Sequence, residues 1–200
     1  MRRIVIATSN RGKLAEFRQL FAGQPFEIVG LDEYPEVRLP EETGMTYSAN
    51  AVLKAEAVAL AVGEWSLGDD SGLEVDSLGG KPGLYSARFA TELRPGETQD
   101  AANRRKLIES LRALPLKSEQ WTACFVCWLA LARPNQHTVM YSGIAEGAVI
   151  AEPRGSRGFG YDPLLLLEDL GRTFAELSDV EKNGLSHRGK AVRALLASLA

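Results

Sequence analysis

The chain opens with a strand-like run, a polar turn and a helical pattern in direct succession, and this order restricts the fold more than any other feature. Arg2 to Ala7 is apolar and β-branched, as in a buried strand. The turn Thr8-Ser9-Asn10 follows, and Asn10 can cap a helix. Apolar residues then recur at helical spacing, at Leu14, Phe17, Leu20 and Phe21. The pattern predicts a strand–turn–helix unit.

The rest of the chain continues this alternation and then changes to a hairpin pattern. Helices are predicted from about Tyr47 to Val62 and from Thr98 to Leu114, and Ser66 to Asp69 predicts a short strand before an acidic turn. Trp121 to Ala132 and Thr138 to Ile150 predict a long hairpin. The order predicts an α/β fold with a mixed sheet, and 200 residues suit one domain or one domain of two lobes.

Composition narrows the classes of partner. The hydrophobic share of 45% and the net charge of −3 are those of an ordinary globular chain, without the basic field that holds nucleic acid nonspecifically. A phosphate site therefore has to concentrate its positive charge locally. No long apolar segment follows Met1, and stretches such as Leu164 to Leu167 are too short to span a bilayer. We expect a cytoplasmic protein that binds neither membranes nor nucleic acid.

The two cysteines, Cys124 and Cys127, have the C-x-x-C spacing of redox and zinc sites. Their surroundings indicate a buried strand, however, and positions i and i+3 of a strand face opposite sides. A second cysteine pair for zinc is absent from the sequence. We therefore interpret both as small core residues.

The turn after the first strand is a candidate phosphate site. A helix that starts there presents free backbone N–H groups and partial positive charge. The turn and the start of the helix consist of Thr8, Ser9, Asn10, Arg11, Gly12 and Lys13. Gly12 leaves room for the ligand and Lys13 adds a charge, although the Walker A pattern is absent. The alternative is a capped surface helix with a solvated lysine.

Two acidic segments form a candidate Mg²⁺ site. Glu41 and Glu42 lie in one, and Asp69 and Asp70 begin the acidic turn Asp69-Asp70-Ser71-Gly72. Mg²⁺ takes oxygen ligands, commonly one or two carboxylates together with substrate phosphates. Ligands of α/β proteins also bind beyond the carboxyl ends of strands. The alternative is that Asp-Ser-Gly only makes a bend between strands.

A third set of residues suits a nucleotide base. Glycines surround aromatic residues in the segment Gly155 to Pro163, so that the backbone can approach a flat ligand and Phe159 or Tyr161 can stack on it. Asp162, His187 and Arg188 offer directional donors and acceptors. The alternatives are that the aromatic residues only pack in the core and that the histidine only begins a helix.

Together these segments resemble the inosine/xanthosine triphosphate pyrophosphatase family, which removes noncanonical purine nucleotides. Eight segments carry the resemblance, in this order: Thr8 to Lys13, Glu41 to Gly44, Asn50 to Lys54, Asp69 to Leu73, Gly79 to Gly83, Tyr85 to Arg88, Gly158 to Pro163, and Glu181 to Gly189. They span nearly the whole chain. The one small departure is Leu164-Leu165, where relatives often carry Ile-Phe.

The resemblance implies a fold and a site. The family fold is an elongated mixed β-sheet flanked by helices, with two lobes around a deep substrate cleft, usually as a homodimer. Asp70 resembles the general base and metal ligand, and Glu42 helps to hold Mg²⁺. The residues implied to bind the nucleoside triphosphate are Thr8, Ser9, Asn10, Arg11, Gly12, Lys13, Lys54, Ser71, Phe159, Gly160, Tyr161, Asp162, Lys182, His187 and Arg188.

The implied reaction is Mg²⁺-dependent hydrolysis of ITP, dITP, XTP or dXTP to the monophosphate and pyrophosphate. Asp70 orients or deprotonates water for attack at the α-phosphorus, while Lys13 and Lys54 contribute positive potential. Two alternatives stand beside it: a related pyrophosphatase for other nucleotides, such as modified pyrimidines, and a catalytically silent nucleotide sensor. The acidic pair argues against the sensor, because binding alone does not need it.

Overall fold

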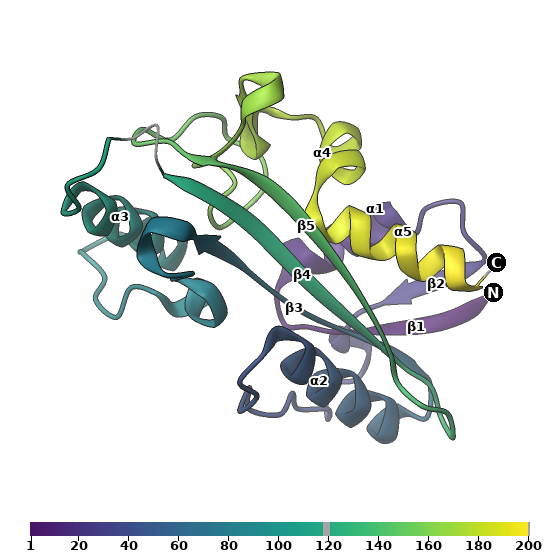
Figure 1. Cartoon of the computed structure of the whole chain (residues 1–200). Helices are drawn as coiled ribbons and strands as arrows, with labels where there is room; N and C mark the ends of the chain where they lie inside the picture. Colours follow the sequence, from purple (N-terminus) through teal and green to yellow (C-terminus); the bar gives the residue numbers. More distant parts are fainter. Residues whose placement is uncertain (118–120, 200) are drawn as a thin grey trace. The chain divides into compact units, whose positions relative to one another are not determined.

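The computed structural model describes residues 1–117 and 121–199, and in these residues a seven-stranded sheet is flanked by helices (Figure 1). The strands are β1 (Arg2–Ala7), β2 (Phe26–Val29), β3 (Trp65–Val75), β4 (Thr122–Ala132), β5 (Val139–Val149), β6 (Leu165–Leu167) and β7 (Arg172–Thr173). The α-helices are α1 (Arg11–Leu20), α2 (Tyr47–Val62), α3 (Gln99–Arg112), α4 (Asp179–Leu185) and α5 (His187–Leu199).

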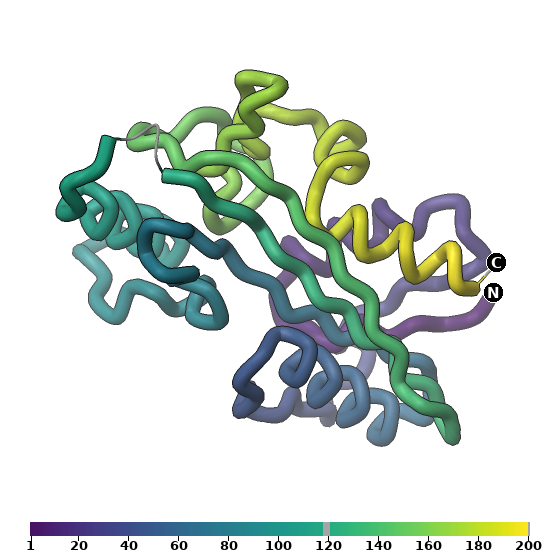
Figure 2. Tube along the Cα trace, viewed as in Figure 1, coloured from purple at the N-terminus to yellow at the C-terminus, as the bar shows by residue number. Residues whose placement is uncertain are grey.

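The sheet is mixed, as the sequence predicts. Its strand order is β2-β1-β3-β4-β5-β6-β7. β1 pairs in parallel with β2 and β3, whereas β6 pairs antiparallel with both β5 and β7. Figures 1 and 2 show β4 and β5 running side by side as the predicted hairpin.

The chain divides into two compact units. The first unit consists of Met1–Asp70, Cys127–Gly143 and His187–Ala200, and the second consists of Ser71–Val126 and Ile144–Ser186. The boundaries fall inside or beside β3, β4 and β5. One domain of two lobes around a deep cleft stays a prediction.

The first unit has a core on each face of its strands. On one face, α1 and α5 pack against alternate residues of β1, β3 and β4, with Phe17, Leu67 and Leu129 among the buried side chains. On the other face lies α2, whose small residues Ala51 and Ala55 pack against β4. Figure 1 shows these helices on opposite faces. Consecutive residues of β3 therefore point toward different helices.

In the described residues of the second unit, a hydrophobic core includes parts of β3, β4 and β5. α3 contributes Leu107 and Leu111, which pack with Leu73 of β3, Phe125 of β4 and Phe174. Phe125 and Phe174 lie edge to face, with ring centroids 5.7 Å apart. This core holds the loop that carries the predicted base-binding residues, because Tyr161 and Leu164 belong to it.

Local sequence signals predict several element boundaries correctly. Asn10 caps α1, where its Oδ1 accepts the Lys13 N–H at 3.0 Å. α2 spans Tyr47–Val62 as predicted, and Thr98 is the cap of α3. Ser178 caps α4 and forms a capping box with Glu181.

The acidic turn predicted at Asp69-Asp70-Ser71-Gly72 is wrong. These four residues lie inside β3, which is continuous from Trp65 to Val75. β3 is flanked by β1 and β4, and its parallel pairing with β1 reaches Gly68. The neighbouring strands outweigh the local turn preference of Asp, Ser and Gly, because their ladders satisfy backbone groups that a turn would leave open.

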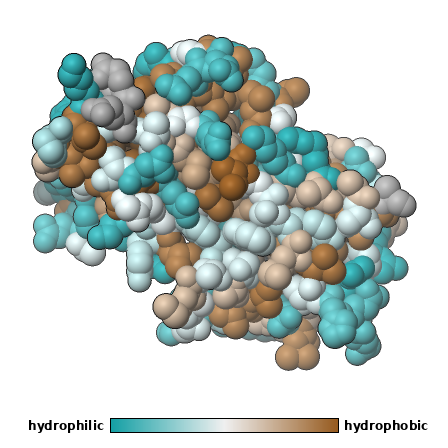
Figure 3. All heavy atoms as spheres, viewed as in Figure 1, coloured by the Kyte–Doolittle hydropathy of each residue, from teal (hydrophilic) through white to brown (hydrophobic). Residues whose placement is uncertain are grey.

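No described helix has the length and apolarity needed to cross a membrane. Figure 3 shows hydrophobic residues in small groups among hydrophilic ones on the face that it draws.

Gly68 sets how closely α2 approaches β3. A Cβ atom placed there would lie 2.1 Å from the Ala51 carbonyl oxygen and 2.9 Å from the Ala55 nitrogen. Both neighbours are helix backbone, which cannot rotate away as a side chain does. Glycine therefore lets α2 pack against the strand directly beside Asp69 and Asp70.

We predict that Gly68→Ala lowers the melting temperature. Overpacking of this kind costs about 1–3 kcal/mol, and each kcal/mol corresponds to about 2–4 °C in a chain of this size. Thermal unfolding followed by circular dichroism measures the change. Gly184→Ala in α4 is the control, because nothing lies within 4 Å of its added Cβ. Equal melting temperatures for both variants and the wild type would contradict the packing argument.

Candidate phosphate and metal site

The turn before α1 presents backbone donors at a helix start. Thr8 Oγ1 accepts the Asn10 N–H at 3.1 Å, and Asn10 in turn caps the helix that begins at Arg11. Ser9, Asn10 and Arg11 are exposed, so a ligand can reach them. The helix N-terminus adds partial positive charge. This geometry suits an anion such as phosphate.

Asp69 is a fully buried carboxylate held by two cations. Its Oδ1 pairs with Lys13 Nζ, and its Oδ2 accepts a hydrogen bond from Arg188 Nε at 2.9 Å. Cys127 Sγ lies 3.4 Å from the same Oδ2. The interactions join α1, β3 and the start of α5. Asp69 thus faces the α1 and α5 side of the sheet.

Arg188 is buried at 2% exposure and is engaged with two carboxylates. Besides Asp69, its Nη1 pairs with Glu16 of α1. Its guanidinium also lies over the Phe17 ring, 5.7 Å from the centroid. Arg188 therefore ties α5 to α1 and β3 in this structure.

Arg188 and Lys13 keep the Asp69 carboxylate ionised although it is buried. Burial by itself raises the pKa of Asp69, but Arg188 and then Lys13 lower that pKa well below the ordinary value. Burial likewise opposes the charge of Arg188, whose pKa is nevertheless raised by Asp69 and Glu16. Each oxygen of this buried carboxylate is engaged by a cation, and we therefore interpret Asp69 as a structural anchor.

Asp70 faces the opposite side, toward α2. Its Oδ2 accepts a hydrogen bond from Asn50 Nδ2 at 3.1 Å, and its Oδ1 lies 3.6 Å from Lys54 Nζ. The same Lys54 Nζ lies 2.6 Å from Glu42 Oε1. Asn50 also accepts the Gly44 N–H at 2.8 Å, which holds the Glu42 segment against α2. Two carboxylates thus share one lysine.

The surroundings of Asp70 favour an added cation. Burial raises the pKa of Asp70, Lys54 opposes this, and Glu42 raises that pKa further. No group of three or more His, Cys, Asp or Glu residues with metal-site geometry occurs in the described part of the chain. Mg²⁺ commonly takes only one or two protein carboxylates and completes its shell with phosphates and water. The pair Glu42 and Asp70 fits that pattern.

The predicted base-binding residues of the second unit form their own cluster. Asp162 Oδ2 accepts the Phe159 N–H at 2.8 Å and lies 2.6 Å from Lys182 Nζ. The Lys182 ammonium lies over the Phe159 ring, 5.1 Å from its centroid. Gly158 has a φ of +73°, and a Cβ there would lie 2.0 Å from Asp162 Oδ2. Only glycine therefore fits at position 158 in this loop conformation.

Tyr161 anchors the same loop in the core. It is buried, and its hydroxyl donates to the Ser86 carbonyl oxygen at 2.9 Å. The interpretation of Tyr161 as a core residue therefore describes its side chain better than stacking on a base. Phe159, in contrast, is only half-buried.

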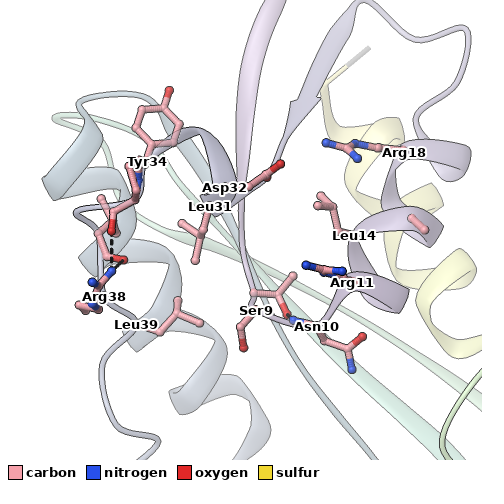
Figure 4. A pocket seen from close by; sticks show the side chains of 14 residues that line it. Ser9, Asn10, Arg11, Leu14, Arg18, Leu31, Asp32, Tyr34, Arg38 and Leu39 are labelled. Atoms are coloured by element: carbon pink, nitrogen blue, oxygen red, sulfur yellow. Dashed lines mark hydrogen bonds between the residues drawn. The ribbon is translucent and has the colours of Figure 1, made fainter.

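A pocket of about 670 Å³ lies beside the phosphate turn in the first unit (Figure 4). Three arginines border it, Arg11 and Arg18 from α1 and Arg38 from the segment after Tyr34. One carboxylate, Asp32, lies among them. No ion pair of the described residues engages Arg11 or Arg18. In a chain of net charge −3, this is a local concentration of positive charge.

The structure distributes the predicted site residues over both units. Thr8 to Lys13, Glu42, Lys54, Asp70, His187 and Arg188 lie in the first unit. Ser71, Phe159 to Asp162 and Lys182 lie in the second. Lys182 and Asp162 meet, and so do Lys54, Glu42 and Asp70, whereas Arg188 contacts Asp69 and Glu16.

Sequence reasoning assigned no role to Asn50, Glu16, Arg18 or Arg38. A role for Asn50 could have been predicted, because this residue lies four positions before Lys54 and so shares its helix face. The Glu16–Arg188 pair joins residues 172 positions apart and had no local signal.

The two cysteines are not joined by a disulfide. Both are free; Cys127 is buried and Cys124 is half-buried. Burial raises the pKa of Cys124 to about 11. Burial also raises the pKa of Cys127, well above its ordinary value. The core interpretation is confirmed for Cys127 and holds in part for Cys124.

The fold and the site together define a mixed-sheet α/β protein with a cluster of two carboxylates and a lysine and with an exposed helix N-terminus, a set suited to a cation and phosphate. A model of the Ham1 family matches residues 4–198. The chain belongs to the Ham1 family, which confirms the resemblance drawn from the eight segments.

Two relatives named dITP/XTP pyrophosphatase match over nearly their whole length. The dITP/XTP pyrophosphatase of Bacillus subtilis is 43% identical over 98% of this chain and 96% of its own. That of Nitratidesulfovibrio vulgaris is 46% identical over 96% of this chain and 93% of its own. The structure of a HAM1 protein from Coxiella burnetii has a TM-score of 0.86 at 37% identity, covering 100% of this chain and 98% of that one.

We predict that Asp69→Ala destabilises the fold while Asp70→Asn does not. Removing the Asp69 carboxylate leaves Lys13 and Arg188 without their shared partner, a loss of about 3–5 kcal/mol for a buried ion pair. Asp70→Asn keeps the size of the side chain and an acceptor for Asn50. Urea unfolding measures both. A midpoint for Asp69→Ala equal to that of the wild type would show that Asp69 is no anchor.

Proposed function

We propose that this chain is a metal-dependent nucleoside-triphosphate pyrophosphatase that hydrolyses the noncanonical purine nucleotides ITP, dITP, XTP and dXTP to monophosphate and pyrophosphate. The observation that carries the proposal is the sharing of Lys54 between Glu42 and Asp70. Relatives named dITP/XTP pyrophosphatase, at 43% and 46% identity, support the substrate class.

The phosphate chain is assigned to the first unit. Backbone donors and side chains of Thr8, Ser9, Asn10, Arg11 and Gly12 bind its oxygens at the start of α1. Lys13, already fixed by Asp69, and Lys54 supply positive potential. Ser71, next to Asp70 in β3, contacts the substrate. The pocket arginines extend this potential on the other side of α1.

Glu42 and Asp70 would hold Mg²⁺. When bound, Mg²⁺ supplies charge neutralisation for the phosphate oxygens. Asp70 orients a water molecule or accepts its proton for attack at the α-phosphorus. Asn50 holds the Asp70 carboxylate in place through its hydrogen bond to Oδ2.

The base is assigned to Phe159, Gly160, Tyr161, Asp162 and Lys182, with Phe159 as the stacking ring. His187 and Arg188 remain in the proposal as base contacts. A donor facing the C6 keto oxygen of inosine or xanthosine would be left unpaired by the amino group of adenine.

We further propose a cytoplasmic homodimer that acts on free nucleotides. The net charge of −3 offers no extended basic surface for a nucleic-acid polymer. The testing experiment is a substrate panel with and without EDTA. Pyrophosphate release from ITP and XTP that far exceeds release from ATP, GTP and dUTP and stops with EDTA supports the proposal. Faster release from dUTP favours the pyrimidine alternative, and no release favours the sensor.

Asp70→Asn is expected to abolish turnover of ITP while the protein stays folded. The substitution removes the negative charge that binds the cation and the proton acceptor, yet preserves the shape of the side chain. Pyrophosphate release and circular dichroism measure the two effects. Turnover close to that of the wild type would remove Asp70 from its catalytic role.

Arg18→Glu is expected to weaken product inhibition by pyrophosphate about fivefold, with little effect on inhibition by inosine monophosphate. The pocket potential acts on the leaving phosphates, and an exposed charge contributes up to about 1 kcal/mol. Inhibition constants for both products provide the measurement. Arg112→Glu, a charge reversal at an exposed position of α3, is the control. Equal changes for the two products would contradict the placement.

A further inference from the structure

The peptide of Gly160 is held on both sides by two side chains of α3. The Gly160 N–H donates to Asp100 Oδ2 at 2.8 Å, and the Gly160 carbonyl oxygen accepts from Arg104 Nη1 at 2.6 Å. Asp100 and Arg104 are four residues apart and so lie on the same helix face. One face of α3 thus satisfies both backbone groups of a single loop residue.

This contact is not a by-product of an ion pair. Among the ion pairs of the described residues, Arg104 has no carboxylate partner, whereas its neighbour Arg105 pairs with Glu97 and Glu109. The guanidinium of Arg104 is therefore directed to a carbonyl oxygen. Hydrogen bonds in which one partner is charged are stronger than neutral ones.

Gly160 lies at a turn of the loop, between Phe159 and Tyr161. Its φ of +59° is in the left-handed region, where the backbone reverses direction. Phe159 precedes it, with its N–H on Asp162 and its ring against Lys182. Tyr161 follows, anchored to the Ser86 carbonyl oxygen. Fixing the Gly160 peptide between these two residues leaves Phe159 little freedom to change its direction.

We propose that Asp100 and Arg104 are positioning residues that determine how Phe159 meets the purine base. They hold the Gly160 peptide and act on the substrate only through the loop. The inference rests on the proposed assignment of the base to Phe159–Asp162. It adds that two side chains of α3 influence which purine base the enzyme prefers.

The test uses Arg104→Met, which keeps the apolar stem and removes the donors, Arg104→Lys, which restores one donor, and Asp100→Ala. Arg112→Met is the control on the same helix, because Arg112 pairs only with the exposed Glu152 among the described ion pairs. Two readouts apply to each full-length protein: amide hydrogen exchange of the segment 158–161, and kcat and KM for ITP and GTP.

Arg104→Met and Asp100→Ala are expected to speed exchange in segment 158–161 and to raise KM for ITP about tenfold, as the loss of one charge-assisted hydrogen bond implies. The value of kcat stays within about twofold, because neither residue touches the phosphates. Preference for ITP over GTP falls. Arg104→Lys recovers most of the change in KM, and Arg112→Met matches the wild type in both readouts.

Unchanged exchange in Arg104→Met and Asp100→Ala would show that these two side chains do not hold the backbone of Gly160. Faster exchange with an unchanged KM, or a loss in kcat alone, would overturn the role in specificity. Failure of the proposed function is visible separately, because the wild-type enzyme would then show no preference for ITP before any substitution is made. The exchange measurement needs no substrate, so it tests whether Asp100 and Arg104 hold the Gly160 backbone in either case.

Discussion

The Asp69 carboxylate, buried between Lys13 and Arg188, is the interaction on which the rest of the site depends. It connects α1, β3 and the start of α5, three elements far apart in the sequence. A carboxylate in the interior is stable as an ion only with such partners. Once Asp69 is fixed in this way, Lys13 stands at the phosphate turn and β3 has a defined rotation about its axis.

The orientation of β3 also determines the side of the sheet on which the Asp70 side chain lies. Neighbouring residues of a strand face opposite sides, so Asp70 points toward α2, where Asn50 and Lys54 receive it. Gly68, on the same side, lets α2 approach closely enough for these contacts. One acidic residue thus anchors the fold and the next performs the proposed chemistry. The adjacent pair has two roles because a strand has two faces.

The sequence predicts what depends on local patterns. The first strand, the bounds of α2, the cap at Asn10 and the mixed sheet all follow from periodicity and capping chemistry. The acidic turn was wrong, since Asp-Ser-Gly favours a bend only when no strands pair with it. The partner of Asp69 was beyond prediction, because Arg188 lies 119 residues away and no local signal links them. Role assignments for Asp70 and Lys182 came from resemblance, and the structure adds their actual neighbours.

The position of bond cleavage tests the central account most directly. Hydrolysis of ITP in ¹⁸O-labelled water, followed by mass spectrometry of both products, shows which phosphorus water attacks. Attack at the α-phosphorus, as oriented by Asp70, places the label in inosine monophosphate and leaves pyrophosphate unlabelled. Label in pyrophosphate, or release of labelled orthophosphate with inosine diphosphate, would contradict the account.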